Sequence, residues 1–592
     1  MDRQAWIAVA LCVLGLIAWQ FYMTSHAPPP LPVRSPTPAA QVREATVTPG
    51  APVGEPSAPT NPSGSTEARP PVDQPSPTPA PVSFAERTEI LRNSDLELLL
   101  TNRGGGIKEA TLPGHTVESG ANVRLNPGSD IPIGAILEKP SSPVLNEFAI
   151  SRQSDGSVEF ERALPDQVTL HKKFSIPPSP NKKESYIAQL EISFKNDGAR
   201  PYVNPGYFIA LGSAGPIHEN DWPTFTRITW CVGGTAKYTD VSWFAEQNKF
   251  FGLQKRPAQE FYSAKVNGAE WTGVSNQFFA TLITPLDAKA TEVWAQRLEV
   301  KPAPPPPAPS IFAIEGAMGM PGFQLQPNQT AAVRFQIYAG PKLYHRLAQL
   351  DHNEAEIMDF GMFKIVCQVL LNALNSLHSV LRSYGVAILA LTAIIKLILW
   401  PLQNKANRSM RRMSALSPKM QELRDKYKDD PTRMNQEVMK LYKDYGINPV
   451  SGCLPMLIQI PIFFGLFTML RQAVELRNAQ FLWVHDLSQP DTIAHVPGFG
   501  WPINILPLIM AGTNIWLMRL TPKSGDATQQ KVMMFMPLIF VVFCYNFAAA
   551  LALYYTTQNL FTILQLYQTR NQPLPVLEKV AVAGKKARKG RR

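Results

Sequence analysis

The sequence predicts a multi-domain protein with a polytopic α-helical membrane core and an all-β domain outside the membrane. Long apolar runs dominate residues 361–592, whereas short β-like runs separated by Gly, Pro and Asn fill the middle of the chain. The charge is divided in the same way: residues 361–592 hold 27 Lys+Arg and 11 Asp+Glu, and residues 23–360 hold 29 and 34. Charged residues make up 17% of the chain, below the roughly 25% that is usual for soluble domains.

Two other classes of protein are disfavoured by the composition. The five cysteines are scattered, which excludes a disulfide-stapled scaffold. DNA binding is not predicted, because the basic residues lie in short stretches between apolar spans rather than on one soluble module.

Residues 1–23 are predicted to form a transmembrane anchor. Within them, residues 5–22 are apolar apart from Gln20, and this length just spans a hydrocarbon core of about 30 Å. A cleaved signal peptide is the competing interpretation, but Pro28 directly after the candidate site Ser25-His26-Ala27 disfavours cleavage. Residues 24–83 are predicted to be a disordered spacer, because residues 28–82 contain 17 prolines and few large apolar residues.

Residues 84–341 are predicted to form a β-rich domain. Gly, Pro and Asn separate many short strands, a pattern typical of a sandwich. The expected strands are residues 96–101, 157–164, 168–176, 186–194, 207–212, 277–283, 292–300 and 332–338. Residues 102–106 are expected to form a turn and residues 302–309 a rigid loop, and Cys231 is the only cysteine of this domain.

Residues 342–382 are predicted to be amphipathic or interfacial helices. Leu343, Leu347, Leu350 and Ile357 recur at helical spacing, so residues 342–360 are expected to lie along the membrane surface. Residues 362–381 are expected to form a helix that leads into the bilayer.

Residues 383–570 are predicted to form the membrane core, with spans at 384–402, 449–470, 501–520, 532–547 and 551–567. The loop 403–448 holds 11 Lys+Arg, the loop 471–500 holds two, and residues 570–592 hold eight. Since basic loops remain in the cytoplasm, both termini are predicted to be cytoplasmic and the β domain to lie across the membrane.

The loop 403–448 is expected to be a charged helical hairpin. Helices are predicted at residues 419–428 and 432–445, with a break at Asp429-Asp430-Pro431 and an end at Gly446. A connector that only sets orientation is one interpretation, and a docking surface for a polypeptide is the other. The length favours docking, because orientation needs far fewer than 46 residues.

Lys396 lies within the apolar run 391–400. A cation there costs about 2.5 kcal/mol or more at mid-bilayer. The amine could extend toward the cytoplasmic interface near Gln403, about 10 Å along the helix, or it could face a wet cavity and stay charged. The five later spans contain no Asp or Glu, so in the second case it would attract a transient carboxylate, including one on a guest chain.

Uncharged polar residues accompany Lys396 in the spans and include Thr392, Gln459 and Asn514. They could bond helices to one another or line a hydrated groove within the bilayer. No nucleophile–base pair, phosphate loop or metal-ligand set is evident, so no enzyme activity, cofactor or metal is predicted. The basic tail, residues 571–592, is expected to bind anionic lipid or RNA such as that of the ribosome, unless it only reinforces topology.

Several motifs together resemble the YidC/Oxa1/Alb3 family of membrane protein insertases, in its long Gram-negative form. The strongest is residues 448–463, Asn-Pro-Val-Ser-Gly-Cys-Leu-Pro-Met-Leu-Ile-Gln-Ile-Pro-Ile-Phe. Matches follow at residues 474–477, 483–487, 535–537 and 553–555, and in the soluble part at residues 101–105 and 276–280.

The resemblance implies a five-helix insertase core in addition to the N-terminal anchor helix, with a groove open to the cytosol and a periplasmic β-supersandwich. It implies insertion and folding of nascent proteins of the cell inner membrane, alone or beside the Sec translocon. The groove cation falls on Lys396, and the other groove residues on Thr392, Gln459 and Asn514. The apolar surface along which the substrate slides falls on Ile460, Phe463, Phe464, Met534 and Pro537.

Two positions depart from the family pattern. Lys396 stands where Arg is usual in bacteria, and it keeps the charge but lacks the bidentate fork. Ala548-Ala549-Ala550 stands where a Pro-Ser-Gly-like turn is common. A secondary transporter for a small anion and a membrane-tethered carbohydrate-binding protein stay as alternative functions, the latter by fold analogy alone.

Overall fold

The computed structural model describes residues 85–140, 142–178, 185–218, 221–249, 254–300, 310–428, 430–447, 454–497, 500–521, 539 and 541–570. The predicted anchor, the spacer, the loop 302–309 and the basic tail lie outside these residues. So do most of the predicted span 532–547 and the start of the motif at 448–463.

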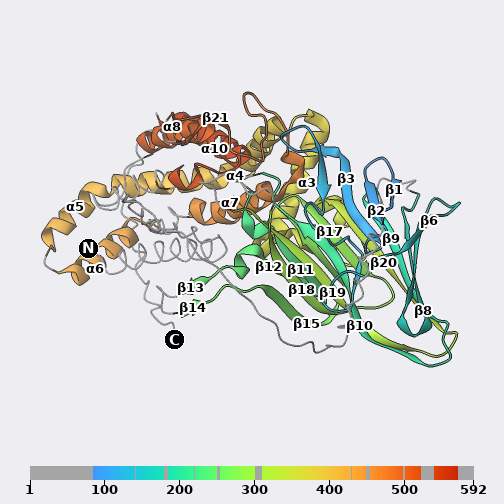
Figure 1. Ribbon diagram of the computed structural model, residues 1–592. Helices are drawn as coiled ribbons and strands as arrows, with labels where there is room; N and C mark the ends of the chain where they lie inside the picture. Colours follow the sequence, from blue (N-terminus) through green and yellow to red (C-terminus); the bar gives the residue numbers. More distant parts are fainter. Residues whose placement is uncertain are drawn as a thin grey trace, which may run out of the picture.

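Antiparallel sheets build the domain at residues 85–341 (Figure 1). One sheet has the order β1-β2-β3-β4 and a second the order β15-β18-β19-β10-β5. The third and largest has the order β12-β11-β16-β17-β20-β9-β8-β7-β6. Their bounds are β1 Thr88–Arg92, β2 Glu97–Thr101, β3 Gly106–Thr116, β4 Asn122–Leu125, β5 Ile136–Leu137, β6 Ala149–Arg152, β7 Val158–Leu164, β8 Val168–Ser175, β9 Ile187–Asn196, β10 Tyr202–Ala214, β11 Arg227–Val232, β12 Thr235–Asp240, β15 Phe261–Ala269, β16 Trp271–Ser275, β17 Phe279–Pro285, β18 Ala290–Glu299, β19 Phe312–Leu325 and β20 Thr330–Pro341. A small hairpin, β13 Gln247–Lys249 and β14 Gln254–Arg256, extends from the domain.

The two larger sheets pack face to face, which confirms the predicted sandwich. Their closest approach is at Gly316 of β19, where a Cβ atom would lie 2.7 Å from Ile228 and 3.0 Å from Val274 of the opposite sheet. Each predicted strand falls on an observed one, although β10 begins at Tyr202 rather than at residue 207. The strand continues through Asn204-Pro205-Gly206, which the sequence suggested to be a turn.

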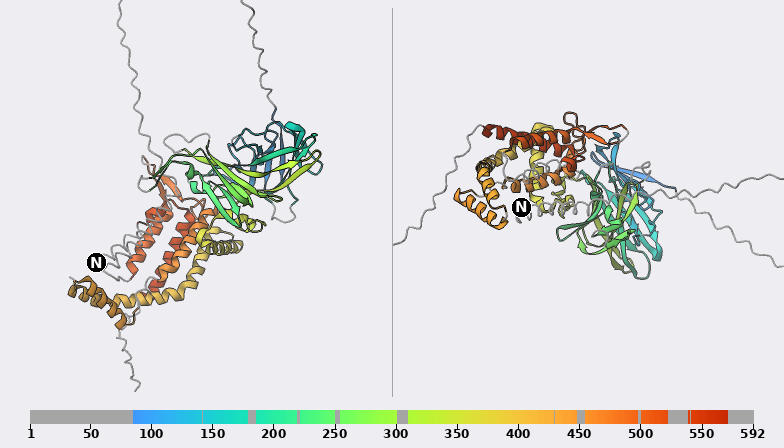
Figure 2. Two further views of the ribbon diagram at one scale, coloured as in Figure 1. Left: turned by 90° about the horizontal axis from the view of Figure 1, so that it is seen from below. Right: turned by 90° about the vertical axis from the view of Figure 1, so that its left-hand side faces the viewer.

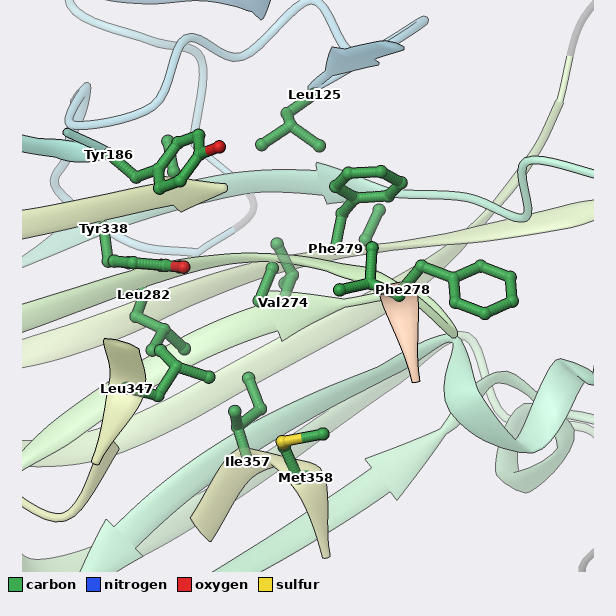
Figure 3. Close-up of a cluster of buried hydrophobic side chains, with 14 of the residues drawn as sticks. Leu125, Tyr186, Val274, Phe278, Phe279, Leu282, Tyr338, Leu347, Ile357 and Met358 are labelled. Atoms are coloured by element: carbon green, nitrogen blue, oxygen red, sulfur yellow. The ribbon is translucent and has the colours of Figure 1, made fainter. Parts of the chain in front are cut away.

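The prediction of an amphipathic helix at residues 342–360 is wrong. Only α2, Tyr344–Leu347, and a 3-10 turn at Glu354–Met358 are helical. Leu347, Ile357 and Met358 are fully buried beside the β sheet (Figure 3). The apolar spacing therefore reflects a segment that packs on the β domain, and the Trp271 indole donates to the His352 carbonyl at 2.9 Å to hold it there.

Helices form the remainder of the described chain. Their bounds are α3 Lys364–Leu381, α4 Tyr384–Ala415, α5 Ser417–Lys426, α6 Pro431–Asp444, α7 Leu454–Gln472, α8 Ile505–Leu520 and α10 Ala549–Arg570. A short hairpin, β21 Thr492–His495 and β22 Pro502–Asn504, precedes α8. The β domain lies at one end of the helices and the α5–α6 hairpin at the other (Figure 2).

α4 runs to Ala415, well past the predicted end of its span at residue 402. By length and hydropathy alone, it is the one helix in the described part of the chain that is long and apolar enough to cross a membrane. α8 is apolar but shorter, with 16 residues.

Candidate functional site

Polar side chains from three helices meet on α10. Thr562 of α10 accepts a hydrogen bond from the Lys396 amine of α4 at 2.8 Å. Gln558 accepts from the Gln459 amide of α7 at 3.1 Å. Gln558 and Thr562 share one face of α10 because they are four residues apart. We call Lys396, Gln459, Asn514, Gln558, Asn559 and Thr562 the polar layer.

α8 joins the polar layer through Asn559. Its amide donates to Asn514 and to Thr513 of α8, both at 3.1 Å. Nearer the cytoplasmic end of α10, Gln565 donates to Asn404 of α4 at 2.7 Å. These bonds explain why α10 is rich in amides and hydroxyls although it packs among apolar helices.

Lys396 is half-buried and points at α10 rather than along its own helix toward Gln403. Its partner Thr562 is neutral, and its own hydroxyl donates to the Gln558 carbonyl at 2.8 Å. Among the described residues, no carboxylate lies within ion-pair distance of the Lys396 amine. The cation is therefore held by a single neutral acceptor.

Thr392 lies one turn from Lys396 but does not bond to it. Its side chain is 1% exposed, and its hydroxyl donates to the Ile388 carbonyl of the same helix at 2.7 Å. Gln459, by contrast, also lies 3.3 Å from the Tyr554 hydroxyl of α10. Sequence reasoning missed Thr562, although its spacing from Gln558 carried the signal.

The predicted sliding surface is described in part. Ile460 is exposed, whereas Phe463 packs on Tyr555 at 5.5 Å and Phe464 stacks on Phe363 at 5.8 Å. Met534 and Pro537 lie outside the described residues.

The hairpin that follows α4 is built from α5 and α6. Asp430 caps α6 by accepting from the Arg433 amide at 3.0 Å. Leu416, Tyr445 and Ile447 form a small buried cluster at its base. Most of the other hairpin side chains are at least partly exposed, so the hairpin presents a charged surface.

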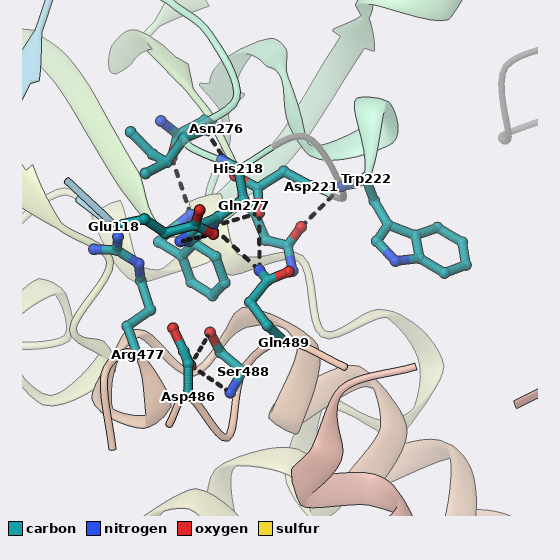
Figure 4. Close-up of polar contacts among 12 residues, drawn as sticks. Glu118, His218, Asp221, Trp222, Asn276, Gln277, Arg477, Asp486, Ser488 and Gln489 are labelled. Carbon is teal, nitrogen blue, oxygen red and sulfur yellow. Dashed lines mark hydrogen bonds and ion pairs between the residues drawn. The ribbon is translucent and has the colours of Figure 1, made fainter. Parts of the chain in front are cut away.

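The β domain contacts the helices through the segment after α7 (Figure 4). Gln277 of the domain donates to the Arg471 carbonyl at 2.8 Å. The Gln489 amide lies 3.1 Å from Nδ1 of His218 and 3.3 Å from the Asp221 carboxylate. Motifs at residues 276–280, 474–477 and 483–487, which are far apart in the sequence, thus flank one interface.

Arg477 is buried at this interface. It donates to the Thr116 carbonyl at 3.1 Å, and its guanidinium lies 5.4 Å from the Phe278 ring and 5.1 Å from the Phe279 ring. Burial lowers the pKa of Arg477 from its usual range. Asn478 also bonds to Thr116, at 3.2 Å, so the first sheet of the domain is tied to the loop as well.

Comparisons with known proteins match both parts of the chain. Residues 90–373 match the family model described as "YidC periplasmic domain", and residues 376–574 match "60Kd inner membrane protein". A membrane protein insertase YidC from Syntrophobacter fumaroxidans is 33% identical over 420 residues, which cover 69% of this chain and 70% of that protein. One from Syntrophus aciditrophicus is 29% identical over 592 residues, which cover 97% and 100%. A crystal structure described as an active YidC insertase with the first transmembrane domain resolved is 18% identical, covers 83% of this chain and 94% of that one, and has a TM-score of 0.35.

Proposed function

The chain belongs to the YidC family of membrane protein insertases, and from this premise we propose that guest proteins enter the bilayer along the polar layer, with Lys396 as its central cation. The family assignment favours insertion over the transporter and carbohydrate-binding alternatives. The observation that carries the proposal is the bond from the Lys396 amine to a neutral hydroxyl, Thr562, in a set of spans without Asp or Glu.

A guest carboxylate is a stronger acceptor than that hydroxyl. Charge-assisted hydrogen bonds are roughly twice as strong as neutral ones, and this difference grows where water is scarce. Lys396 can therefore exchange Thr562 for an acidic residue of a guest chain, and it can release the guest because Thr562 is available to take the amine back.

Insertion then proceeds in three steps. The hairpin formed by α5 and α6 captures a nascent hydrophobic segment. The polar outer end of the guest enters a cytosol-open hydrophilic groove lined by Lys396, Gln459 and Asn514, with Thr392 beside them. The apolar stretch moves along Ile460, Phe463 and Phe464, with Met534 and Pro537 on the neighbouring span, into lipid.

Hydrophobic partitioning drives the process, at roughly 25 cal/mol per Å² of apolar area, and the membrane potential assists the transfer of charged ends. The partners are nascent proteins of the inner membrane, the Sec translocon, and anionic lipids or the ribosome at the basic tail. Both termini lie in the cytoplasm, and the chain also helps its guests to fold.

Substitution of Lys396 tests the cation. Lys396→Glu should reduce insertion of a single-span guest with acidic residues in its outer end at least tenfold, because two like charges then meet in the groove. Lys396→Arg should retain insertion, since the charge is kept. The measurement is protease protection of the guest in vesicles, with crosslinking to α10 in parallel.

Lys405→Glu is the matched control, because Lys405 lies on the same helix but is exposed. It should leave insertion near the wild-type level, and a guest with a neutral outer end should be far less sensitive to Lys396→Glu. Equal insertion of the acidic guest by the wild type and by Lys396→Glu would remove the cation from the mechanism.

A further inference from the structure

An aromatic layer lies between the polar layer and the β domain. On α7, Phe463 and Phe467 follow Gln459 by one and two turns. Phe463 lies 5.5 Å from Tyr555 of α10, and Phe467 lies 5.2 Å from Phe547. A fifth ring, Phe543, lies 5.2 Å from Phe547. We call these five rings the aromatic layer.

The β domain adds its own ring to this layer. Trp222, directly before the 3-10 turn Pro223–Phe225, packs edge-on against Phe547 with 5.7 Å between the ring centroids. The ring therefore comes from the periplasmic domain, and Phe547 from the membrane core.

Arg471, in the last turn of α7, holds Trp222 in place. Its guanidinium lies 3.8 Å from the Trp222 ring, 4.9 Å from the Phe225 ring and 4.7 Å from the Phe467 ring. A guanidinium over aromatic rings is attracted by about 0.5–2 kcal/mol per contact, more when water is excluded. The cation thus joins rings of the domain to a ring of the core.

One amide fixes the register of this contact. The Gln277 carbonyl oxygen accepts from the Trp222 backbone amide at 2.9 Å, and the same side chain donates to the Arg471 carbonyl at 2.8 Å (Figure 4). Gln277 is 4% exposed, so both bonds lie away from water. The position of Trp222 relative to α7 is therefore determined by two directional bonds as well as by ring packing.

We propose that the periplasmic domain closes the outer end of the membrane core, with Trp222 as the outermost ring of an aromatic seal that Arg471 and Gln277 position. Water that reaches the polar layer from the cytoplasm meets five apolar rings before it meets the periplasm. Without Trp222, Phe547 and Phe467 would face the periplasmic solvent directly.

The proposal rests on the proposed function in one respect only, the assignment of the polar layer to a wet path. Access from the periplasm tests the seal, and access from the cytoplasm tests the wet path, so the two can fail separately. Trp222, Gln277 and Arg471 are positioning residues, because none of them belongs to the polar layer.

The experiment uses the full-length chain with the reporter Thr562→Cys and a membrane-impermeant thiol reagent. In spheroplasts the reagent reaches the protein from the periplasm, and in inverted vesicles from the cytoplasm. The wild-type chain, whose described cysteines Cys231, Cys367 and Cys544 are buried, gives the background. Trp222→Ala should raise the periplasmic labelling rate of the reporter at least tenfold and leave the cytoplasmic rate unchanged.

Trp222→Tyr should keep the reporter closed, because an aromatic ring is retained. Trp243→Ala is the matched control, since Trp243 packs on Phe244 and Tyr262 within the domain, and it should leave the periplasmic rate unchanged. Arg471→Gln, which alters the core side of the contact, should raise the rate as Trp222→Ala does, and it provides the test if Trp222→Ala misfolds.

An unchanged periplasmic rate in the folded Trp222→Ala and Arg471→Gln chains would overturn the seal, whatever the cytoplasmic rate is. A reporter that never reacts from the cytoplasm would instead overturn the wet path of the proposed function.

Discussion

Lys172 shows how this chain accommodates a buried cation. The side chain is 1% exposed, and its amine donates to the carbonyls of Gly104, Gly105 and Gly134. The amine also lies 5.5 Å from the Phe148 ring and 5.6 Å from the Phe174 ring. These contacts tie the turn after β2 to the largest sheet, and burial lowers the pKa of Lys172 to about 7.

The stability of the periplasmic domain should therefore depend on pH. An unfolded lysine keeps a pKa near 10.5, so between about pH 7 and pH 10 the unfolded chain binds a proton that the native chain lacks. The free energy of unfolding should rise with pH across this window. Urea unfolding of the full chain in detergent, followed by tryptophan fluorescence, measures it.

Two variants assign this effect to its residue. Lys172→Met should remove the rise, because it has no proton to lose. Lys173→Met should keep it, since the neighbouring Lys173 points outward and pairs with Asp155 at 2.9 Å. A rise that persists in Lys172→Met would locate the titration elsewhere.

At this scale the sequence carried more information than we extracted. The alternation of β8 places Val168, Leu170, Lys172 and Phe174 on one buried face, so the inward position of Lys172 was predictable. Lys396 was identified because its neighbours are apolar. Its partner Thr562 was not, because a contact between residues 166 positions apart depends on how the helices pack.

Among the elements, β19 and the segment 342–360 mark the limits of pattern analysis. β19 contains the run Gly-Ala-Met-Gly-Met-Pro-Gly, which lacks the β-branched residues that identify a strand. Small residues are present because the sheets approach closely at Gly316, and only the tertiary structure reveals that need. The segment 342–360 failed for the opposite reason, since buried loop residues imitate a helical period.

The cap of α6 allows a test of the hairpin. Loss of a capping carboxylate costs roughly 1 kcal/mol, so Asp430→Ala should speed amide exchange in the first turn of α6 by about fivefold. Hydrogen–deuterium exchange of the full chain measures this. If the hairpin captures guests, crosslinking of a nascent segment to α6 should decrease as well.

Asp444→Ala is the control for that experiment, because Asp444 lies at the other end of α6, where a negative charge does not cap the helix. Equal exchange in the wild type and in Asp430→Ala would show that the first turn of α6 does not depend on its cap.

In the molecule as a whole, the domain and the membrane core share one hydrophobic cluster that includes residues from Leu91 to Tyr554. The order of the domains and the helical nature of the core were predictable from composition and charge. The docking of the two parts was not, because Thr116 and Arg477 meet across 361 positions of sequence. Only the motifs on both sides of the interface indicated that these segments matter.

Gln489 tests the strength of that docking. Gln489→Ala removes the bonds to His218 and Asp221, and a bond to a charged group contributes about 1.5–3 kcal/mol. Amide exchange in residues 481–491 should therefore increase at least several-fold, while the thermal unfolding of the β domain stays close to that of the wild type.

Gln259→Ala should leave this exchange unchanged, since Gln259 bonds only to the carbonyls of its neighbours Pro257 and Ala258. If exchange of residues 481–491 does not respond to Gln489→Ala, the loop is held by its other contacts, such as those of Arg477 and Asn478.

The interface at Thr116, His218 and Gln277 also has a consequence for biogenesis. Ribosomes make residues 85–341 before residues 454–570, so the exported domain is complete while the spans that bind it are still being synthesised. When the loop 471–491 emerges on the far side, it meets a prefolded template whose donors and acceptors are already in position. The last helices of the chain are thus assembled against a scaffold that the first half has provided.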